Sequence, residues 1–92
     1  MNYKYALPER LFAQAVALEE FANGAAQCHA RLLNGTIQAG LLVSNATAVI
    51  AMRGHASLPF SVEAIATLFQ LDEDKNPTQR DGWDFFDKWP AT

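Results

Sequence analysis

Residues 32–52 contain no charged side chain, and this uncharged run restricts the possible folds more than any other feature of the sequence. Read as a helix, the run has a narrow seam of small side chains at four-residue steps, with Leu42, Val49 and Ile50 on the other side. The seam consists of Thr36, Gly40, Ser44 and Ala48. A helix that is apolar most of the way round belongs in the centre of a bundle or in an oligomer interface. We therefore expect a central helix over residues 36–52.

Two other structures are compatible with the length of this run. One is a β-hairpin at residues 36–53, with strands 36–43 and 46–53 around Ser44-Asn45. Two features disfavour the hairpin: its arms contain five alanines and glycines, and its turn lacks glycine. The other is a membrane span, because about 20 residues suffice to cross a bilayer. The run is too polar to be a good span because it contains Asn34, Gln38, Ser44, Asn45 and Thr47. The hairpin stays open as the alternative.

Three more segments show helical patterns. Residues 8–33 begin with a proline suited to a first helical turn and repeat apolar side chains every three or four positions, with an interruption at Asn23-Gly24. Ser61 is a suitable N-cap for residues 62–69, and Asn76-Pro77 for residues 77–89. The sixteen alanines also favour helix. The sequence thus predicts one domain (residues 1–92), an all-α bundle of four to five helices; an α+β fold with the hairpin is the alternative.

The charge distribution bears on possible partners. The net charge is -3, and the seven basic residues are scattered along the chain, so we expect no direct binding to nucleic acid. Residues 1–54 hold three acids and four bases, a charge of +1, whereas residues 55–92 hold seven acids and three bases, a charge of -4. A basic partner would therefore dock on the C-terminal part. With one cysteine and no apolar signal segment, we expect a cytoplasmic protein.

A calcium site deserves a test because Asp72, Asp74 and Asn76 match the first three ligand positions of an EF-hand loop. The match fails at the sixth position, where Pro77 replaces the required glycine, and at the twelfth, where Trp83 replaces a bidentate glutamate. We interpret the segment as a solvated acidic loop.

Catalytic side chains are hard to find in this sequence. Cys28 and His29 are adjacent, so on a helix they point about 100° apart and do not form a dyad. His55 is distant in sequence, so only the tertiary fold would bring it near Cys28 and His29. These three residues also do not indicate a zinc site, which needs more ligands at closer spacing. We therefore predict no catalytic residue, no cofactor and no metal, and we rank a small enzyme or ligand-binding domain last.

The most unusual segment is the C-terminal run, where aromatic residues alternate with aspartates. On a helix, Trp83 and Phe86 share one face, and Phe85 and Trp89 form a second stripe. Either both stripes belong to the core, or one is a protein-binding surface in which aromatics are the anchor and carboxylates steer the encounter. The candidate partner-binding residues are Asp81, Trp83, Asp84, Phe85, Asp87 and Trp89.

These features favour a non-catalytic protein-protein interaction module that self-associates. The alternative is an acidic inhibitor or antitoxin-like protein whose C-terminal segment occupies the basic site of a nucleic-acid-handling partner. Both hypotheses place the protein partner, or a second copy, on the acidic end of the chain.

Overall fold

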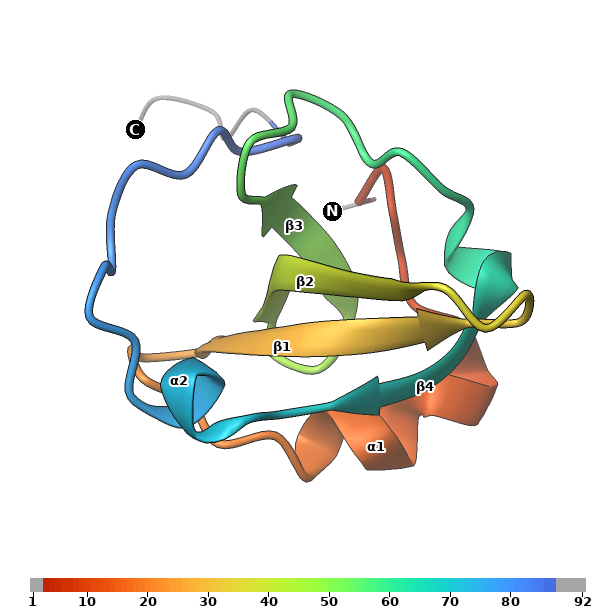
Figure 1. The fold of residues 1–92 in the computed structure, drawn as a ribbon, viewed down its shortest axis with the longest axis horizontal. Coiled ribbons are helices and arrows are strands. Elements are labelled where there is room, and N and C mark those ends of the chain that lie inside the picture. The colour runs from red at the N-terminus through yellow and green to blue at the C-terminus, as the bar shows by residue number, and fades with distance from the viewer. Residues whose placement is uncertain (1–2, 88–92) are drawn as a thin grey trace.

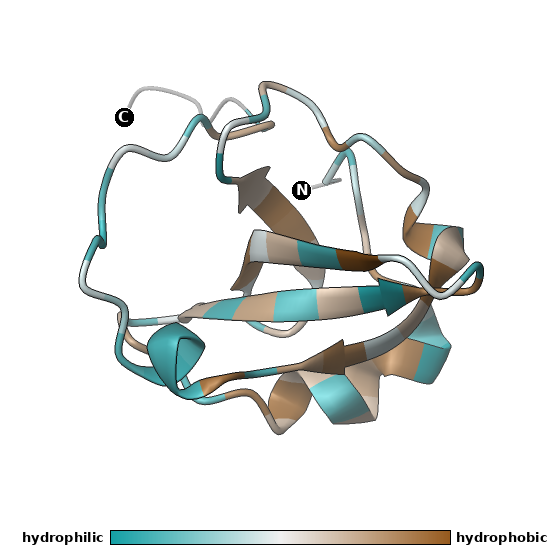
Figure 2. Cartoon of the chain, viewed as in Figure 1, coloured by the Kyte–Doolittle hydropathy of each residue, from teal (hydrophilic) through white to brown (hydrophobic). Residues whose placement is uncertain are grey.

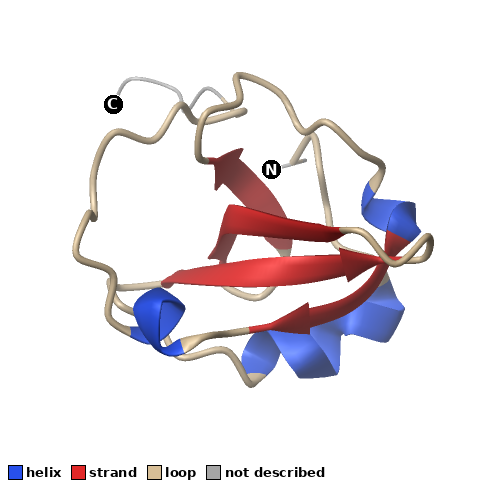
Figure 3. Ribbon diagram, in the orientation of Figure 1, coloured by secondary structure: helices blue, strands red, loops and turns tan. Residues whose placement is uncertain are grey.

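An antiparallel sheet of four strands lies at the centre of the computed structural model, which describes residues 3–87 (Figures 1 and 3). The spatial order is β3-β2-β1-β4. The strands are β1 (Ala25–Leu32), β2 (Ile37–Ser44), β3 (Ala48–Met52) and β4 (Ile65–Phe69). The helical elements within the described residues are short: η1 (Glu9–Leu11), α1 (Phe12–Val16), η2 (Val62–Ala64) and α2 (Asp72–Lys75).

The prediction of an all-α bundle of four to five helices is wrong. The expected central helix over residues 36–52 is instead the pair β2 and β3, joined as the hairpin that the sequence left open. The expected helix over residues 8–33 is helical only in η1 and α1, and its second half is β1. Ser61 does cap η2, but β4 follows where the helix was expected to continue. The described part of the expected last helix, residues 77–87, contains no helix.

The hairpin turn explains why a sequence without glycine can reverse direction here. Asn45 and Ala46 have φ values of 48° and 61°, and the amide of Thr47 donates to the carbonyl of Ser44 at 2.9 Å. Two successive residues with positive φ are typical of the type I′ turns that join twisted strands. Asparagine tolerates this conformation, whereas alanine adopts it only at a cost in free energy.

The alanines of β3 favoured a helix in the sequence, but in the structure they allow close packing. All five residues of β3 are buried. Val49 and Met52 face the larger core cluster, whereas Ile50 and Ala51 both face a second cluster on the opposite side of the sheet. A bulge at Ile50 interrupts the usual alternation, because Ala51 and Val49 pair with successive residues of β2. A strand buried on both faces lacks the polar alternation that would identify it from sequence.

The two faces of the sheet are covered by different parts of the chain. We call the face of the larger core cluster the apolar face; it packs against η1, α1 and the loop that contains Leu58. Its buried side chains include Leu11, Ala15, Cys28, Leu41, Val43, Ile65 and Leu68. We call the other the polar face; it is covered by α2 and the C-terminal segment, and α2 is among the most hydrophilic parts of the ribbon in Figure 2.

Both outer edges of the sheet carry hydrogen bonds to other segments. On β3, the amide of Val49 donates to the carbonyl of Tyr5, and the carbonyl of Ile50 accepts from the amide of Phe86. On β4, the amide of Leu68 donates to the side-chain carbonyl of Gln14 in α1. These contacts reduce the backbone groups open to pairing with another strand. None of the helices in the described part of the chain has the length and apolarity to cross a membrane.

Candidate functional site

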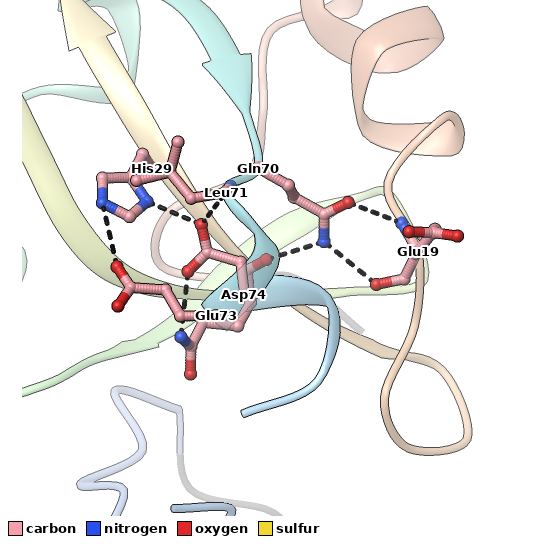
Figure 4. Close-up of polar contacts among 7 residues, drawn as sticks. Glu19, His29, Gln70, Leu71, Glu73 and Asp74 are labelled. Atoms are coloured by element: carbon pink, nitrogen blue, oxygen red, sulfur yellow. Dashed lines mark hydrogen bonds and ion pairs between the residues drawn. The ribbon is translucent and has the colours of Figure 1, made fainter. Parts of the chain in front are cut away.

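Asp74 is the centre of a hydrogen-bond network on the polar face (Figure 4). The residue lies in α2, and its side chain is fully buried. One carboxylate oxygen accepts from the Gln27 side-chain amide at 2.9 Å, and the other accepts from the Leu71 backbone amide at 2.9 Å and lies 2.6 Å from Nδ1 of His29. Burial of a carboxylate is unfavourable unless such partners replace water. The network therefore holds α2 on the sheet.

The position of His29 follows from the strand register. The pairing of β1 with β2 shifts by one residue opposite His29, so Ala39 and Gly40 both face it. Gly40 has a φ of 74°, and a Cβ there would lie 3.0 Å from the Cβ of Arg53. The bulge therefore needs a glycine, and it brings the end of β3 close to the middle of β2.

His29 has a defined orientation. Its ring stacks on Phe69 of β4, with 5.4 Å between ring centroids, and 10% of its side chain is exposed. Because the Asp74 carboxylate is a hydrogen-bond acceptor, the network assigns a hydrogen to Nδ1 and leaves the lone pair of the neutral ring on Nε2. Nε2 faces the Glu73 carboxylate, whose nearer oxygen is 3.9 Å away. His29, Glu73 and Asp74 together form a group that offers metal-ligating atoms within 4.8 Å of one another.

A cavity of about 210 Å³ adjoins this cluster: it is lined by Glu73 and by Gln27, whose side chain donates to Asp74. Its other lining residues are Arg53, Asn76, Pro77, Thr78 and Gln79. A larger cavity of about 500 Å³ lies beside α1 and the Asn45-Ala46 turn, and none of its lining residues is a histidine or a cysteine. Among the described residues, the smaller cavity therefore adjoins the cluster of His29, Glu73 and Asp74, whereas the larger one has a single carboxylate, that of Glu20, in its lining.

Cys28 and His55, the other candidates for chemistry, lie outside this cluster. Cys28 is fully buried on the apolar face, and burial, followed by the negative charge of Asp74, raises the pKa of its thiol to about 12. A thiol with this pKa stays protonated at neutral pH and is a poor nucleophile. His55 is half-buried in the turn after β3, where it forms an isolated bridge with Met52.

The C-terminal segment, residues 76–87, has no regular secondary structure, and we call it the strap. It runs from α2 to the outer edge of β3 (Figure 1); Trp83 packs on the polar face, and Phe86 joins the larger core cluster. The Arg53 guanidinium donates to the carbonyls of Gln79, at 2.7 Å, and Asp81. The same group lies 3.8 Å from the ring centroid of Trp83. Further along, the amide of Phe86 donates to the carbonyl of Ile50 at 2.9 Å. Arg53 and one edge of β3 thus fix the strap at two points.

The predicted partner-binding residues in the strap differ in their exposure to solvent. Asp81, Asp84 and Phe85 are exposed, and Trp83 is half-buried beneath Arg53. Asp87 is buried, and one of its carboxylate oxygens accepts from the backbone amide of Lys4 at 2.9 Å. Trp89 lies outside the described residues. The two helical stripes expected for this run do not form in residues 83–87.

The sequence missed the Asp74 network because its members lie far apart along the chain. Forty-five positions separate His29 from Asp74. We interpreted residues 72–76 as a solvated acidic loop, and for Asp74 this was wrong, although Asp72 and Glu73 are exposed. The one local signal was a glutamine and a histidine at alternate positions of a mainly apolar segment, which places both on the same face of a strand.

Comparisons with protein families, with curated proteins and with solved structures gave no match for this chain. The geometry of the molecule is therefore the basis for a functional proposal.

Proposed function

We propose that this protein is a non-catalytic interaction module whose partner is a second copy of itself, docked through the strap. The main support is the exposure of Phe85, half of whose surface faces solvent although Trp83 and Phe86, close to it in the strap, are anchored. Exposed aromatic side chains are typical anchors of protein interfaces. A segment held in place before binding also loses less conformational entropy when it docks.

Anchoring on both sides keeps Phe85 in position. Trp83 packs under Arg53 and against the smaller apolar cluster of the polar face. Phe86 is buried, donates a backbone hydrogen bond to β3 and meets Tyr5 edge to face, with 5.0 Å between ring centroids. Phe85 therefore lies in the short stretch between these two anchored residues, next to the exposed Asp84, and half of its surface stays exposed.

The charges of the strap favour a second copy over a purely basic partner. Arg80, near its beginning, is exposed, and the exposed acids Asp81 and Asp84 follow. A two-fold axis between antiparallel straps would place Arg80 of one copy near Asp84 of the other, which is the self-complementary arrangement of a symmetric dimer. Asp87 is buried, so the strap has fewer exposed carboxylates than its sequence indicates. This weakens the case for an acidic inhibitor of a nucleic-acid-handling protein.

Two observations support a non-catalytic role. Cys28 is buried with a raised pKa, so it is no activated nucleophile. The Asp74 carboxylate uses both oxygens to hold α2 and His29 in place. A cytoplasmic location remains part of the proposal, and it rests on the single cysteine.

The experiment is sedimentation velocity over a concentration series from low to high micromolar, with wild type, Phe85→Ser and Phe12→Ser. Phe12 is the matched control because it is an exposed phenylalanine on α1, 42% exposed against 50% for Phe85. We expect concentration-dependent association of the wild type, a loss of roughly tenfold or more in association constant for Phe85→Ser, and little change for Phe12→Ser.

Two results would reject the proposal. A wild-type protein that stays monomeric across the series excludes self-association through the strap. If Phe85→Ser and Phe12→Ser lower the association constant equally, association depends on exposed apolar surface in general and not on the strap. Circular dichroism of each variant confirms that the fold is intact.

A further inference from the structure

We infer that His29 and Glu73 form a binding site for a divalent transition-metal ion of the zinc type, with Asp74 as the group that orients the histidine. This inference is independent of the proposed self-association, because the strap residue Phe85 takes no part in it. It rests on the geometry of three side chains and on the cavity next to them (Figure 4).

The first argument is the state of the histidine. Metal-bound histidines almost always donate their other ring N–H to a carboxylate or a carbonyl, which fixes the tautomer and directs the lone pair at the ion. His29 already has this arrangement, because Nδ1 is 2.6 Å from the buried Asp74 carboxylate. Nε2 makes no hydrogen bond to any described residue, and it belongs to a side chain that is nine-tenths buried.

The second argument is the position of Glu73. Its carboxylate oxygen lies 3.9 Å from Nε2, too far for a hydrogen bond. Two ligands of a tetrahedral zinc ion, each about 2.0–2.1 Å from the metal, are about 3.3 Å apart. The Glu73 side chain is 70% exposed, so its carboxylate is free to move the remaining half ångström or so. One imidazole and one carboxylate are ligands that suit zinc and its neighbours in the first transition series. They are fewer than the three or four protein ligands of catalytic and structural zinc sites, so water would occupy the remaining positions of the ion.

Asp74 orients His29 but does not itself bind the ion. Both of its oxygens accept hydrogen bonds, one from Gln27 and the other from the Leu71 amide and His29. Water would complete the coordination of the ion, and the adjoining cavity of about 210 Å³ has room for it. Arg53 also lines that cavity, but its guanidinium is engaged by the carbonyls of Gln79 and Asp81.

The experiment is a Zn²⁺ titration of the full chain, followed by calorimetry and by NMR of the histidine ring nitrogens. The chain has only two histidines, so His55 is an internal reference. We expect saturable binding of one ion, with a shift at Nε2 of His29 and none at the ring of His55.

Matched variants separate a metal site from general attraction to acidic groups. Glu73→Gln removes one proposed ligand at an exposed position, and we expect affinity to fall roughly tenfold or more. Asp72→Asn is the control, because it changes the same charge on an exposed neighbour in α2 that lies outside the cluster. It should leave the affinity nearly unchanged.

Asp74→Asn tests the orienting role. An amide at this position can donate to Nδ1 of His29, and the ring hydrogen then moves to Nε2. Nε2 no longer has a free lone pair to bind the ion. We expect affinity to fall by about 10- to 100-fold. In the metal-free variant, the NMR spectrum should show the lone pair on Nδ1, a change that loss of packing alone would not produce.

The inference fails if the wild type does not bind Zn²⁺, or if bound Zn²⁺ leaves the His29 ring unshifted. It also fails if Glu73→Gln and Asp72→Asn bind equally well. Because Glu73 and Asp72 are exposed, both variants should fold as the wild type does, which their amide spectra will show.

Discussion

The segments that cover the two faces of the sheet are held there by different kinds of interaction. The apolar face packs Leu11, Leu41 and Ile65 into a continuous core. On the polar face, α2 and the strap are attached through hydrogen bonds to Asp74 and through the contacts of Arg53 with the strap. Apolar packing is non-directional and tolerates moderate changes of shape, whereas a buried polar network depends on each partner. The comparison shows that one small sheet combines a conventional core with a face whose order depends on a few side chains.

The largest expected effect comes from breaking the polar network. Asp74→Ala leaves the Leu71 amide, the Gln27 side chain and Nδ1 of His29 without their acceptor. The His29 contact is buried and the other two are partly buried. A fully buried donor left unpaired costs about 1–3 kcal/mol, so for the three together we expect the free energy of unfolding to fall by about 4 kcal/mol. Urea denaturation measures it. A loss below about 1 kcal/mol would show that α2 does not depend on this network.

A truncation on the apolar face gives the matching measurement. Leu41 is fully buried in the middle of β2, and Leu41→Ala removes its contacts and leaves a cavity. Substitutions of this kind cost about 2–5 kcal/mol, and we expect about 3 kcal/mol here. Urea denaturation against wild type tests this, and an unchanged midpoint would contradict the central position of Leu41.

The contrast between the faces also explains what the sequence could predict. The N-cap at Ser61 was predicted correctly, because local spacing and side-chain type determine it, although the helix that it begins is only one short turn. The hairpin was ranked second because the alanines of β3 were counted as helix formers. In the structure, Ala48 and Ala51 are buried in the cluster of the polar face.

The polar face was not predicted because its contacts join distant segments. Nothing near His29 indicates that Asp74 will be its partner, and nothing near Arg53 indicates that its guanidinium will hold residues 79–83. Sequence periodicity reports which side of an element is buried, but it does not report which element covers that side.

A pH-dependent prediction concerns Cys28, on the apolar face. Burial raises the pKa of its thiol from 9.0 to about 12, so between these values the unfolded chain loses the proton and the folded chain keeps it. The unfolded state then binds fewer protons, and stability falls as pH rises. Relative to Cys28→Ala, the wild type should lose about 1 kcal/mol of unfolding free energy between pH 9 and pH 10. A parallel pH dependence of the two proteins would contradict the burial of the thiol.

The smallest expected effect is at the β2–β3 turn. Ala46 has a φ of 61°, a conformation that glycine adopts without strain. We expect Ala46→Gly to raise the free energy of unfolding by about 0.5–1 kcal/mol, partly offset by lost packing of its methyl group on the core. Thermal unfolding would show the gain. A clear destabilisation would argue against the turn described here.

Hydrogen exchange of two backbone amides, measured by NMR, tests most directly whether the polar face is ordered. The Leu71 amide donates to Asp74, and the Phe86 amide donates to Ile50 at the end of the strap. If α2 and the strap are fixed as described, both amides exchange far more slowly than in the urea-unfolded chain. If both exchange at the unfolded rate while the amides of β1 and β2 stay protected, the polar face is open and the account of the strap and of the His29 site is wrong.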